Sequence, residues 1–326
     1  MSDLRRALVI GCGRIAGGYN QGRKDAMVLT HALAYVRHKD YFLAACVEPD
    51  AKMRAAFMEK WNVPRGYSTL EGALEAERFD VASICSPTGT HLAVLGRLLE
   101  ADMRAVFAEK PLDGDAIGAR KLGERFAAKA VPVAVNFTRR FDPAMQKLRS
   151  EIAAKRYGAL RSVVGWYAQG IMNNGVHLID LVIYLTGRAP KVSHIGNTRE
   201  DGAVGDPTVS ALLDLDGVPV HFVGSGGREA ARFEIELAFS GAIISIEQGG
   251  LAMRLRRFGP SETFPGTVVP DQGNSAATGY GGAMLSALDE LIAWRPGARL
   301  SSDIESACEA IAIADEIRRI APGISR

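Results

Sequence analysis

The fold is decided near the N-terminus by residues 7–17, which read Ala7-Leu8-Val9-Ile10-Gly11-Cys12-Gly13-Arg14-Ile15-Ala16-Gly17. A short apolar strand here runs directly into the pattern G-x-G-x-x-A. Gly11 allows the tight turn from strand to helix, Gly13 lets the backbone approach a pyrophosphate, and the small Ala16 lets the helix lie close to the strand. Free N–H groups and the positive end of the helix then meet the anion. The pattern predicts a dinucleotide-binding turn formed by Gly11, Cys12, Gly13, Arg14 and Ile15.

A second apolar run, residues 42–47, ends in Glu48. An acidic side chain at this place accepts hydrogen bonds from the adenosine ribose, which favours NAD over NADP. The separation from the glycines exceeds the usual spacing of about 20 residues, because the polar residues 20–25 form an inserted loop before a helix expected around 28–37. The alternative for Glu48 is a solvated carboxylate at a strand end.

Two neighbours of Glu48 keep the cofactor choice open. Asp50 is a second candidate for the ribose contact. Arg54 has the charge that would accommodate the 2′-phosphate of NADP. We therefore expect NAD, with NADP as the alternative.

Bulk properties restrict the class of protein. A chain of 326 residues with 47% hydrophobic and 23% charged residues is typical of a globular protein of two domains. The formal net charge of +2 gives no reason to expect nucleic acid, and no apolar run is long enough to cross a membrane. The four cysteines are far apart and form no C-x-x-C pair, so we expect neither a metal site nor disulfides. We expect a cytoplasmic protein with a small-molecule substrate.

The first part of the chain alternates strand and helix patterns, as a parallel sheet with crossover helices requires. We expect a doubly wound Rossmann domain over residues 1–138, with its ligand crevice at the carboxyl ends of the strands. Its expected strands lie near 7–10, 42–47, 80–85, 104–108 and 132–136, and its helices near 14–19, 51–61, 69–76, 91–101 and 114–129.

The second part, residues 139–326, has a different texture. Apart from one helix near 175–186, residues 160–256 contain apolar strand runs broken by turn residues, which predicts an α+β domain on a mostly antiparallel, open sheet. Residues 259–282 are rich in Gly, Pro, Ser and Thr, and we expect an irregular excursion that acts as a lid or a subunit arm. Two helices, near 281–294 and 302–321, close the chain. We expect such a sheet to pair into a homodimer or homotetramer.

Three further segments complete a recognisable set. They read ICSPTGTH at 84–91, AEKPL at 108–112 and NGVHLID at 174–180. With GCGRIA and RRFDP, they resemble the Gfo/Idh/MocA family of nicotinamide-dependent sugar and cyclitol oxidoreductases. The resemblance extends over essentially the whole chain, with five motifs in the family's order.

The resemblance implies roles for the ends of two strands. Ser86, Pro87, Thr88 and His91 would pack against the cofactor, although a capped helix start also explains them. Glu109 and Lys110 would lie beneath the nicotinamide, with a cis bond between Lys110 and Pro111. A lysine ammonium suits this place, because it donates a hydrogen bond to an oxygen that gains negative charge during hydride transfer. The alternative for Lys110 is an ordinary surface lysine.

The resemblance also makes His177 the proton carrier, since an unperturbed imidazole pKa of about 6.5 allows exchange in both directions. A structural histidine in a helix is the alternative. Family members commonly have an aspartate four residues earlier, where this chain has Asn173. Asparagine can orient a hydroxyl, but it cannot stabilise an imidazolium by charge. Asp180 either orients His177 or faces solvent.

Further candidates for substrate contacts are Arg140, Tyr167 and Asn174. Arg140 could hold a carboxylate or phosphate, or pair with Asp142 in the turn. Asn136, Arg139 and Gln169 lie nearby in the sequence. Asparagine at position 173 is reminiscent of family members that act on nucleotide-linked amino sugars.

The resemblance implies hydride transfer between the nicotinamide and a secondary alcohol or ketone of a sugar, cyclitol or nucleotide sugar. In this hypothesis Lys110 polarises the oxygen, His177 carries the proton and Asn173 orients them. The alternatives are a dinucleotide-binding regulator without catalysis, and a glycoside hydrolase or dehydratase that uses NAD transiently.

Overall fold

A computed structural model describes residues 4–112, 116–226 and 232–321. The chain divides into two compact units, of which the first comprises Met1–Phe141 with Gly281–Cys308 and the second Asp142–Tyr280 with Glu309–Arg326. The segment 281–308 thus belongs with the first unit, whereas the sequence pattern placed it in the second domain. Hydrophobic packing explains the difference, because Met284, Leu288 and Leu291 are buried in the same core cluster as Val9 and Trp61.

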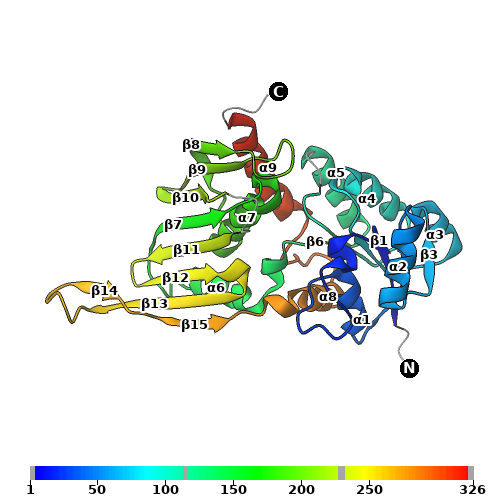
Figure 1. The fold of residues 1–326 in the computed structure, drawn as a ribbon, viewed down its shortest axis with the longest axis horizontal. Helices are drawn as coiled ribbons and strands as arrows, with labels where there is room; N and C mark the ends of the chain where they lie inside the picture. Colours follow the sequence, from blue (N-terminus) through cyan, green and yellow to red (C-terminus); the bar gives the residue numbers. More distant parts are fainter. Residues whose placement is uncertain (1–3, 113–115, 227–231, 322–326) are drawn as a thin grey trace. The chain divides into compact units, whose positions relative to one another are not determined.

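The first unit contains a six-stranded parallel sheet in the order β3-β2-β1-β4-β5-β6, as expected for a Rossmann fold (Figure 1). All five expected strands are present, and the short β3 is an addition that the sequence did not reveal. The order reverses between β1 and β4, which puts the ligand crevice of such a sheet at their carboxyl ends. The strands are β1 (Arg5–Ile10), β2 (Tyr41–Val47), β3 (Arg65–Tyr67), β4 (Val81–Ile84), β5 (Ala105–Ala108) and β6 (Val133–Val135).

Local side chains explain where several helices of this unit begin. Thr30, Asp50 and Thr69 each accept a hydrogen bond from a backbone N–H in the first turn of the helix that follows. The helices and helical turns are η1 (Arg14–Gly18), α1 (His31–Arg37), α2 (Ala51–Trp61), α3 (Leu70–Ala76), η2 (Thr88–Thr90), α4 (His91–Glu100), α5 (Ala116–Ala128), η3 (Thr138–Phe141) and α8 (Ala283–Ala293); α9 (Ile304–Ile320) runs from this unit into the second.

The helix expected at 14–19 is corrected by the structure, which has the single π turn η1 there. The chain then runs through a loop held by Asn20, whose buried side chain accepts from the Leu29 N–H and donates to the Met27 carbonyl. Regular helix resumes only at His31. The inserted polar loop was therefore expected correctly, but it interrupts the helix almost at its start.

The second unit contains a nine-stranded, mostly antiparallel sheet in the order β14-β13-β12-β11-β7-β10-β9-β8, with β15 also paired to β13 (Figure 1). One pair, β7 with β10, is parallel. Its strands are β7 (Leu160–Tyr167), β8 (Lys191–Arg199), β9 (Thr208–Leu215), β10 (Val218–Gly224), β11 (Phe233–Phe239), β12 (Ala242–Glu247), β13 (Ala252–Pro260), β14 (Val268–Pro270) and β15 (Asn274–Ala277). Its other elements are α6 (Pro143–Ala153), η4 (Ile171–Gly175), α7 (Val176–Thr186) and η5 (Gln248–Gly250), and η6 (Tyr280–Gly282) lies at the boundary with the first unit.

Two expectations for this unit need correction. Helix α6 was missed, although Asp142 caps it and Pro143 occupies its first position, both ordinary helix-start signals. Residues 259–282 are not wholly irregular, because β14 and β15 pair with β13. Within the described residues no helix has the length and apolar character needed to cross a membrane.

Candidate functional site in the dinucleotide-binding unit and on helix α7

Gly11 and Gly13 have different tasks in the turn after β1. Gly11 has φ +87°, and a Cβ there would lie 2.7 Å from the backbone nitrogen of Ser86. It therefore permits both the left-handed turn and the close approach of the loop after β4. At Gly13 an added Cβ would meet nothing within 4 Å, so the glycine leaves open space above the turn. This cradle fits the pyrophosphate of a dinucleotide.

The remaining residues of the turn point to the same use. No side chain caps η1 among the described residues, so backbone N–H groups at its start are oriented for an anion. Because η1 is one short turn, these N–H groups rather than a long helix dipole supply the attraction. Arg14 is exposed and its guanidinium stacks on Tyr19 with 5.1 Å to the ring centroid, while Ile15 packs against the core.

Glu48 is held beside this turn. Its Oε2 accepts a hydrogen bond from the backbone N–H of Cys12 at 3.0 Å, and its Oε1 accepts one from Asp50 N at 3.1 Å. Asp50 is committed elsewhere, because its Oδ1 accepts from the N–H groups of Lys52 and Met53 as the cap of α2. The geometry thus favours Glu48 over Asp50 as the ribose ligand.

Arg54 is also engaged. Its guanidinium donates to the backbone carbonyls of Glu48 and Pro49. A 2′-phosphate would have to compete with these bonds and with the nearby Glu48 carboxylate. The local charge and hydrogen bonding favour NAD.

We predict that Glu48→Ala weakens NAD binding about 10-fold and NADP binding much less, since only the free 2′-hydroxyl of NAD donates to the carboxylate. Fluorescence titration with each reduced cofactor measures both affinities. Asp50→Asn, which retains a helix-capping oxygen, is the control and should bind both cofactors as the parent does. Equal weakening of both cofactors by Glu48→Ala would contradict the assignment.

The loop after β4 approaches the turn that follows β5. The Ser86 hydroxyl bonds the Thr90 hydroxyl at 2.7 Å, whereas Pro87 and Thr88 are exposed. The ring of His91 is buried, with Nε2 2.7 Å from the Ser86 carbonyl oxygen and Nδ1 2.8 Å from the Pro111 carbonyl oxygen. A neutral ring donates to one carbonyl and an imidazolium to both. His91 therefore ties together the two loops that the resemblance assigns to the cofactor.

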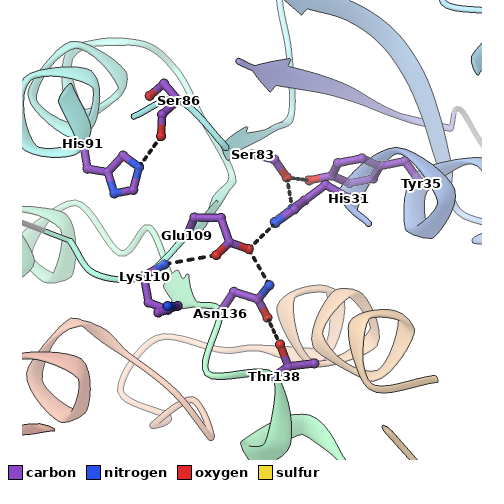
Figure 2. A network of polar contacts seen from close by, with 9 residues as sticks. All are labelled: His31, Tyr35, Ser83, Ser86, His91, Glu109, Lys110, Asn136 and Thr138. Atoms are coloured by element: carbon purple, nitrogen blue, oxygen red, sulfur yellow. Dashed lines mark hydrogen bonds and ion pairs between the residues drawn. The ribbon is translucent and has the colours of Figure 1, made fainter. Parts of the chain in front are cut away.

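A polar network surrounds the end of β5 (Figure 2). Glu109 is buried; its Oε1 lies 3.0 Å from Nε2 of His31 and 2.5 Å from Nδ2 of Asn136, and its Oε2 lies 3.3 Å from the backbone nitrogen of Lys110. Lys110 itself is half-buried, and the expected cis bond to Pro111 is present. Asn136 in turn accepts a hydrogen bond from Thr138 at 2.9 Å.

Burial acts to raise the pKa of the Glu109 carboxyl, but the hydrogen bonds and charge around it lower the pKa by more. The hydrogen bonds from His31 and from the Asn136 amide, together with the Lys110 charge, hold this pKa below its usual value. Glu109 is thus a carboxylate directly beside Lys110. Its negative charge favours the ammonium form of the Lys110 side chain.

Sequence reasoning missed His31, Ser83 and Tyr35. All three are fully or almost fully buried, and Ser83 Oγ lies 2.8 Å from both His31 Nδ1 and the Tyr35 hydroxyl. The sequence did contain a signal, because His31 and Tyr35 lie four residues apart among apolar residues, and buried polar side chains are costly unless they have partners. The separation of 78 residues between His31 and Glu109 concealed the partner.

In the second unit, His177 is the second residue of α7, and Asn173 lies in the preceding π turn. Asn173 and His177 therefore do not lie one α-helical turn apart on the same helix face. Asn173 is exposed and Asn174 half-buried; their side-chain amides donate to the carbonyls of Gln169 and Ala168, respectively. His177 is half-buried with its ring edge-on to Phe233, 6.4 Å between centroids.

Three other residues that the sequence suggested for the site are buried. Tyr167 is fully buried, and its hydroxyl bonds both the N–H and the carbonyl of Val209, so it fastens β9 rather than facing a substrate. Asp180 is only 2% exposed, which excludes a solvent role. Arg140 is buried and donates to the Ser301 carbonyl at 3.3 Å.

Asp206 is a further missed residue. Its Oδ1 accepts from Met172 N at 2.7 Å and its Oδ2 from Asn173 N at 2.9 Å. A Cβ at Gly170 would lie 2.2 Å from Oδ2, so only glycine fits beneath the carboxylate. Asp206 thus fixes the π turn that leads into His177.

We predict that Asp206→Ala lowers the free energy of unfolding by about 1–3 kcal/mol, because it leaves two backbone donors of the π turn without their acceptor. Chemical denaturation measures the change. Asp216→Asn, on an exposed turn, is the charge-matched control and should be neutral. A stability equal to the parent would show that Asp206 does not hold the turn.

Comparisons with known proteins concern the family of the first unit and the fold of both units. Residues 5–137 match the family model described as an oxidoreductase family with an NAD-binding Rossmann fold. A trans-1,2-dihydrobenzene-1,2-diol dehydrogenase of Sus scrofa is 28% identical over 58% of this chain and 61% of its own length. An inositol 2-dehydrogenase of Rhizobium meliloti is 29% identical over 50% of this chain and 52% of its own. The chain thus matches between half and three-fifths of the length of these curated relatives.

The fold likeness covers nearly the whole chain. The crystal structure of myo-inositol 2-dehydrogenase from Lactobacillus plantarum superposes with a TM-score of 0.75 at 19% identity, covering 98% of this chain and 97% of that one. At this identity the likeness supports the fold of both units and nothing finer.

Proposed function

We propose, from the match of residues 5–137 to the Gfo/Idh/MocA oxidoreductase family with its NAD-binding Rossmann fold, that the chain transfers hydride between a nicotinamide and a secondary alcohol or ketone of a sugar, cyclitol or nucleotide sugar. One observation carries the proposal: the glycine turn, the Ser86 loop and the Glu109–Lys110 turn follow the adjacent strands β1, β4 and β5. Parallel strands end at one edge of a sheet, so the cofactor cradle and a charged lysine share that edge.

The chemistry divides between cofactor and protein. The nicotinamide, when bound, accepts or gives the hydride. The Lys110 ammonium donates a hydrogen bond to the reacting oxygen and stabilises the charge that develops on it. We propose that His177 takes the hydroxyl proton during oxidation and returns it during reduction, and that Asn173 and Asn174 orient the hydroxyl groups.

The names of two relatives suggest which class of substrate to test first. One acts on a dihydrobenzenediol and the other on inositol, as their names state. Both compounds are rings with neighbouring hydroxyl groups. We therefore propose a cyclic vicinal diol as the first class of substrate, with Arg140 retained as a candidate for an anionic substituent.

A panel of cyclitols, hexoses and nucleotide sugars, incubated with the protein and NAD, tests the proposal. Formation of NADH with at least one cyclic vicinal diol is the expected result. Tight NADH binding without turnover on any member would instead favour the non-catalytic regulator. A product formed without accumulation of NADH would favour the hydrolase or dehydratase.

Assembly and location belong to the same proposal. We propose a homodimer or homotetramer formed through the open sheet of the second unit. We also propose the cytoplasm as its compartment, because all four cysteines are free thiols, as is usual in a reducing environment. Sedimentation of the purified chain tests the first of these.

A further inference from the structure

The buried array behind Lys110 has a definite order, and this order suggests a task. It runs from the Tyr35 hydroxyl through Ser83 Oγ and the His31 ring to the Glu109 carboxylate (Figure 2). His31 and Ser83 have no exposed surface, and Tyr35 has only 1%. Burial of so many polar groups has a desolvation cost that only a complete set of hydrogen bonds offsets.

The direction of each hydrogen bond follows from the carboxylate. Glu109 can only accept, so Nε2 of His31 donates to it. In a neutral ring Nδ1 then accepts from the Ser83 hydroxyl, and Ser83 in turn accepts from the Tyr35 hydroxyl. This arrangement uses every donor hydrogen of the array once. With the neutral ring the array is satisfied in this orientation, with the carboxylate as its final acceptor.

The carboxylate is consequently fixed from one side. His31 and Asn136 both bond Oε1, which leaves Oε2 directed to the Lys110 backbone (Figure 2). Asn136 comes from the end of β6 and His31 from the start of α1. Loss of either donor would free the carboxylate to rotate away from the lysine.

We infer that His31, supported by Ser83 and Tyr35, is a positioning residue for Lys110, acting through the Glu109 carboxylate. The inference rests on the proposed hydride transfer, in which Lys110 contacts the reacting oxygen. It assigns no contact with substrate to His31. It predicts that the array affects the rate of the chemical step and leaves cofactor binding unchanged.

Two substitutions at one position separate positioning from mere filling of space. In His31→Gln the longer amide can still donate to Glu109, whereas in His31→Asn it reaches only toward Ser83. We expect His31→Asn to lower kcat about 10-fold or more, with KM and the NADH Kd within about twofold of the parent. His31→Gln should recover most of that loss. Ser83→Ala should have an intermediate effect and Tyr35→Phe the smallest.

Two controls accompany these variants. His38→Asn removes another buried imidazole next to α1, one that bonds Asp289 rather than Glu109, and should leave kcat unchanged. Hydrogen exchange of the Lys110 amide gives a readout that needs no substrate. It should accelerate in His31→Asn and not in Tyr35→Phe.

The outcomes are distinct. Equal kcat values for His31→Asn, His31→Gln and the parent would overturn the inference. So would equal losses in His31→Asn, His31→Gln and His38→Asn that follow thermal stability, because they would show only a scaffold role. If the parent turns over no substrate, the proposed function fails, and unchanged Lys110 exchange in both His31→Asn and Ser83→Ala would then overturn the positioning role separately.

Discussion

Replacing Lys110 with methionine is expected to abolish turnover and to leave NADH binding nearly intact. Methionine retains much of the side-chain volume but has no ammonium, so the reacting oxygen would lose its charged donor. Removal of one such donor costs about 10²–10³-fold in kcat in well-studied enzymes. The glycine turn and Glu48 bind the cofactor in this account, and neither is altered by the change.

Steady-state rates and fluorescence titration with NADH test this expectation together. Lys39→Met is the control, since the Lys39 side chain is 84% exposed and pairs only with its neighbour Asp40 among the described contacts. It should have the parent rate. A Lys110→Met variant with full activity would refute the role of Lys110, and one without NADH binding would show that the lysine serves the cofactor instead.

The second large effect is expected for His177→Asn, which should lower kcat about 10²–10⁴-fold because the proton would lose its carrier. The half-buried ring lies edge-on to Phe233, and asparagine removes this ring contact along with the base. Added imidazole should restore part of the rate, because a free base can enter the space that the ring leaves. The measurement is kcat for alcohol oxidation with and without imidazole.

His194→Asn, an exposed histidine on β8, is the matched control in the same unit and should behave as the parent. If His177→Asn has the same rate as the parent, a group other than His177 must carry the proton. Rescue by imidazole distinguishes a lost base from a disturbed helix, since a disturbed helix would not respond to it.

Local patterns were sufficient to predict much of the first unit. Gly11 and Gly13 required a tight turn with space above it, and apolar runs gave all five expected strands of its sheet. The three-residue β3 was too short for a periodic signal. Residues 14–19 carry a helical pattern, yet the chain leaves the helix after one π turn, because the buried Asn20 side chain and its four hydrogen bonds organise the following loop.

The features that escaped prediction depend on contacts between distant residues. His31 and Glu109, which bond each other, are 78 residues apart in the sequence. Asp206 accepts hydrogen bonds from two residues of the π turn that lie 34 and 33 residues before it. Tyr167 was predicted to face the substrate because it precedes the His177 helix, but strand alternation turns it into the core. Helix α8 returns to the first unit, which no local pattern indicates.

Transfer of a labelled hydrogen tests the central claim most directly. The protein is incubated with NAD and cyclic vicinal diols that carry deuterium on their carbinol carbons, and the nicotinamide is analysed by mass spectrometry. The account predicts NADH with one deuterium, formed by the parent and not by Lys110→Met. Tight NAD binding without any deuterated NADH, or conversion of the diol with the label returned to the product, would contradict it.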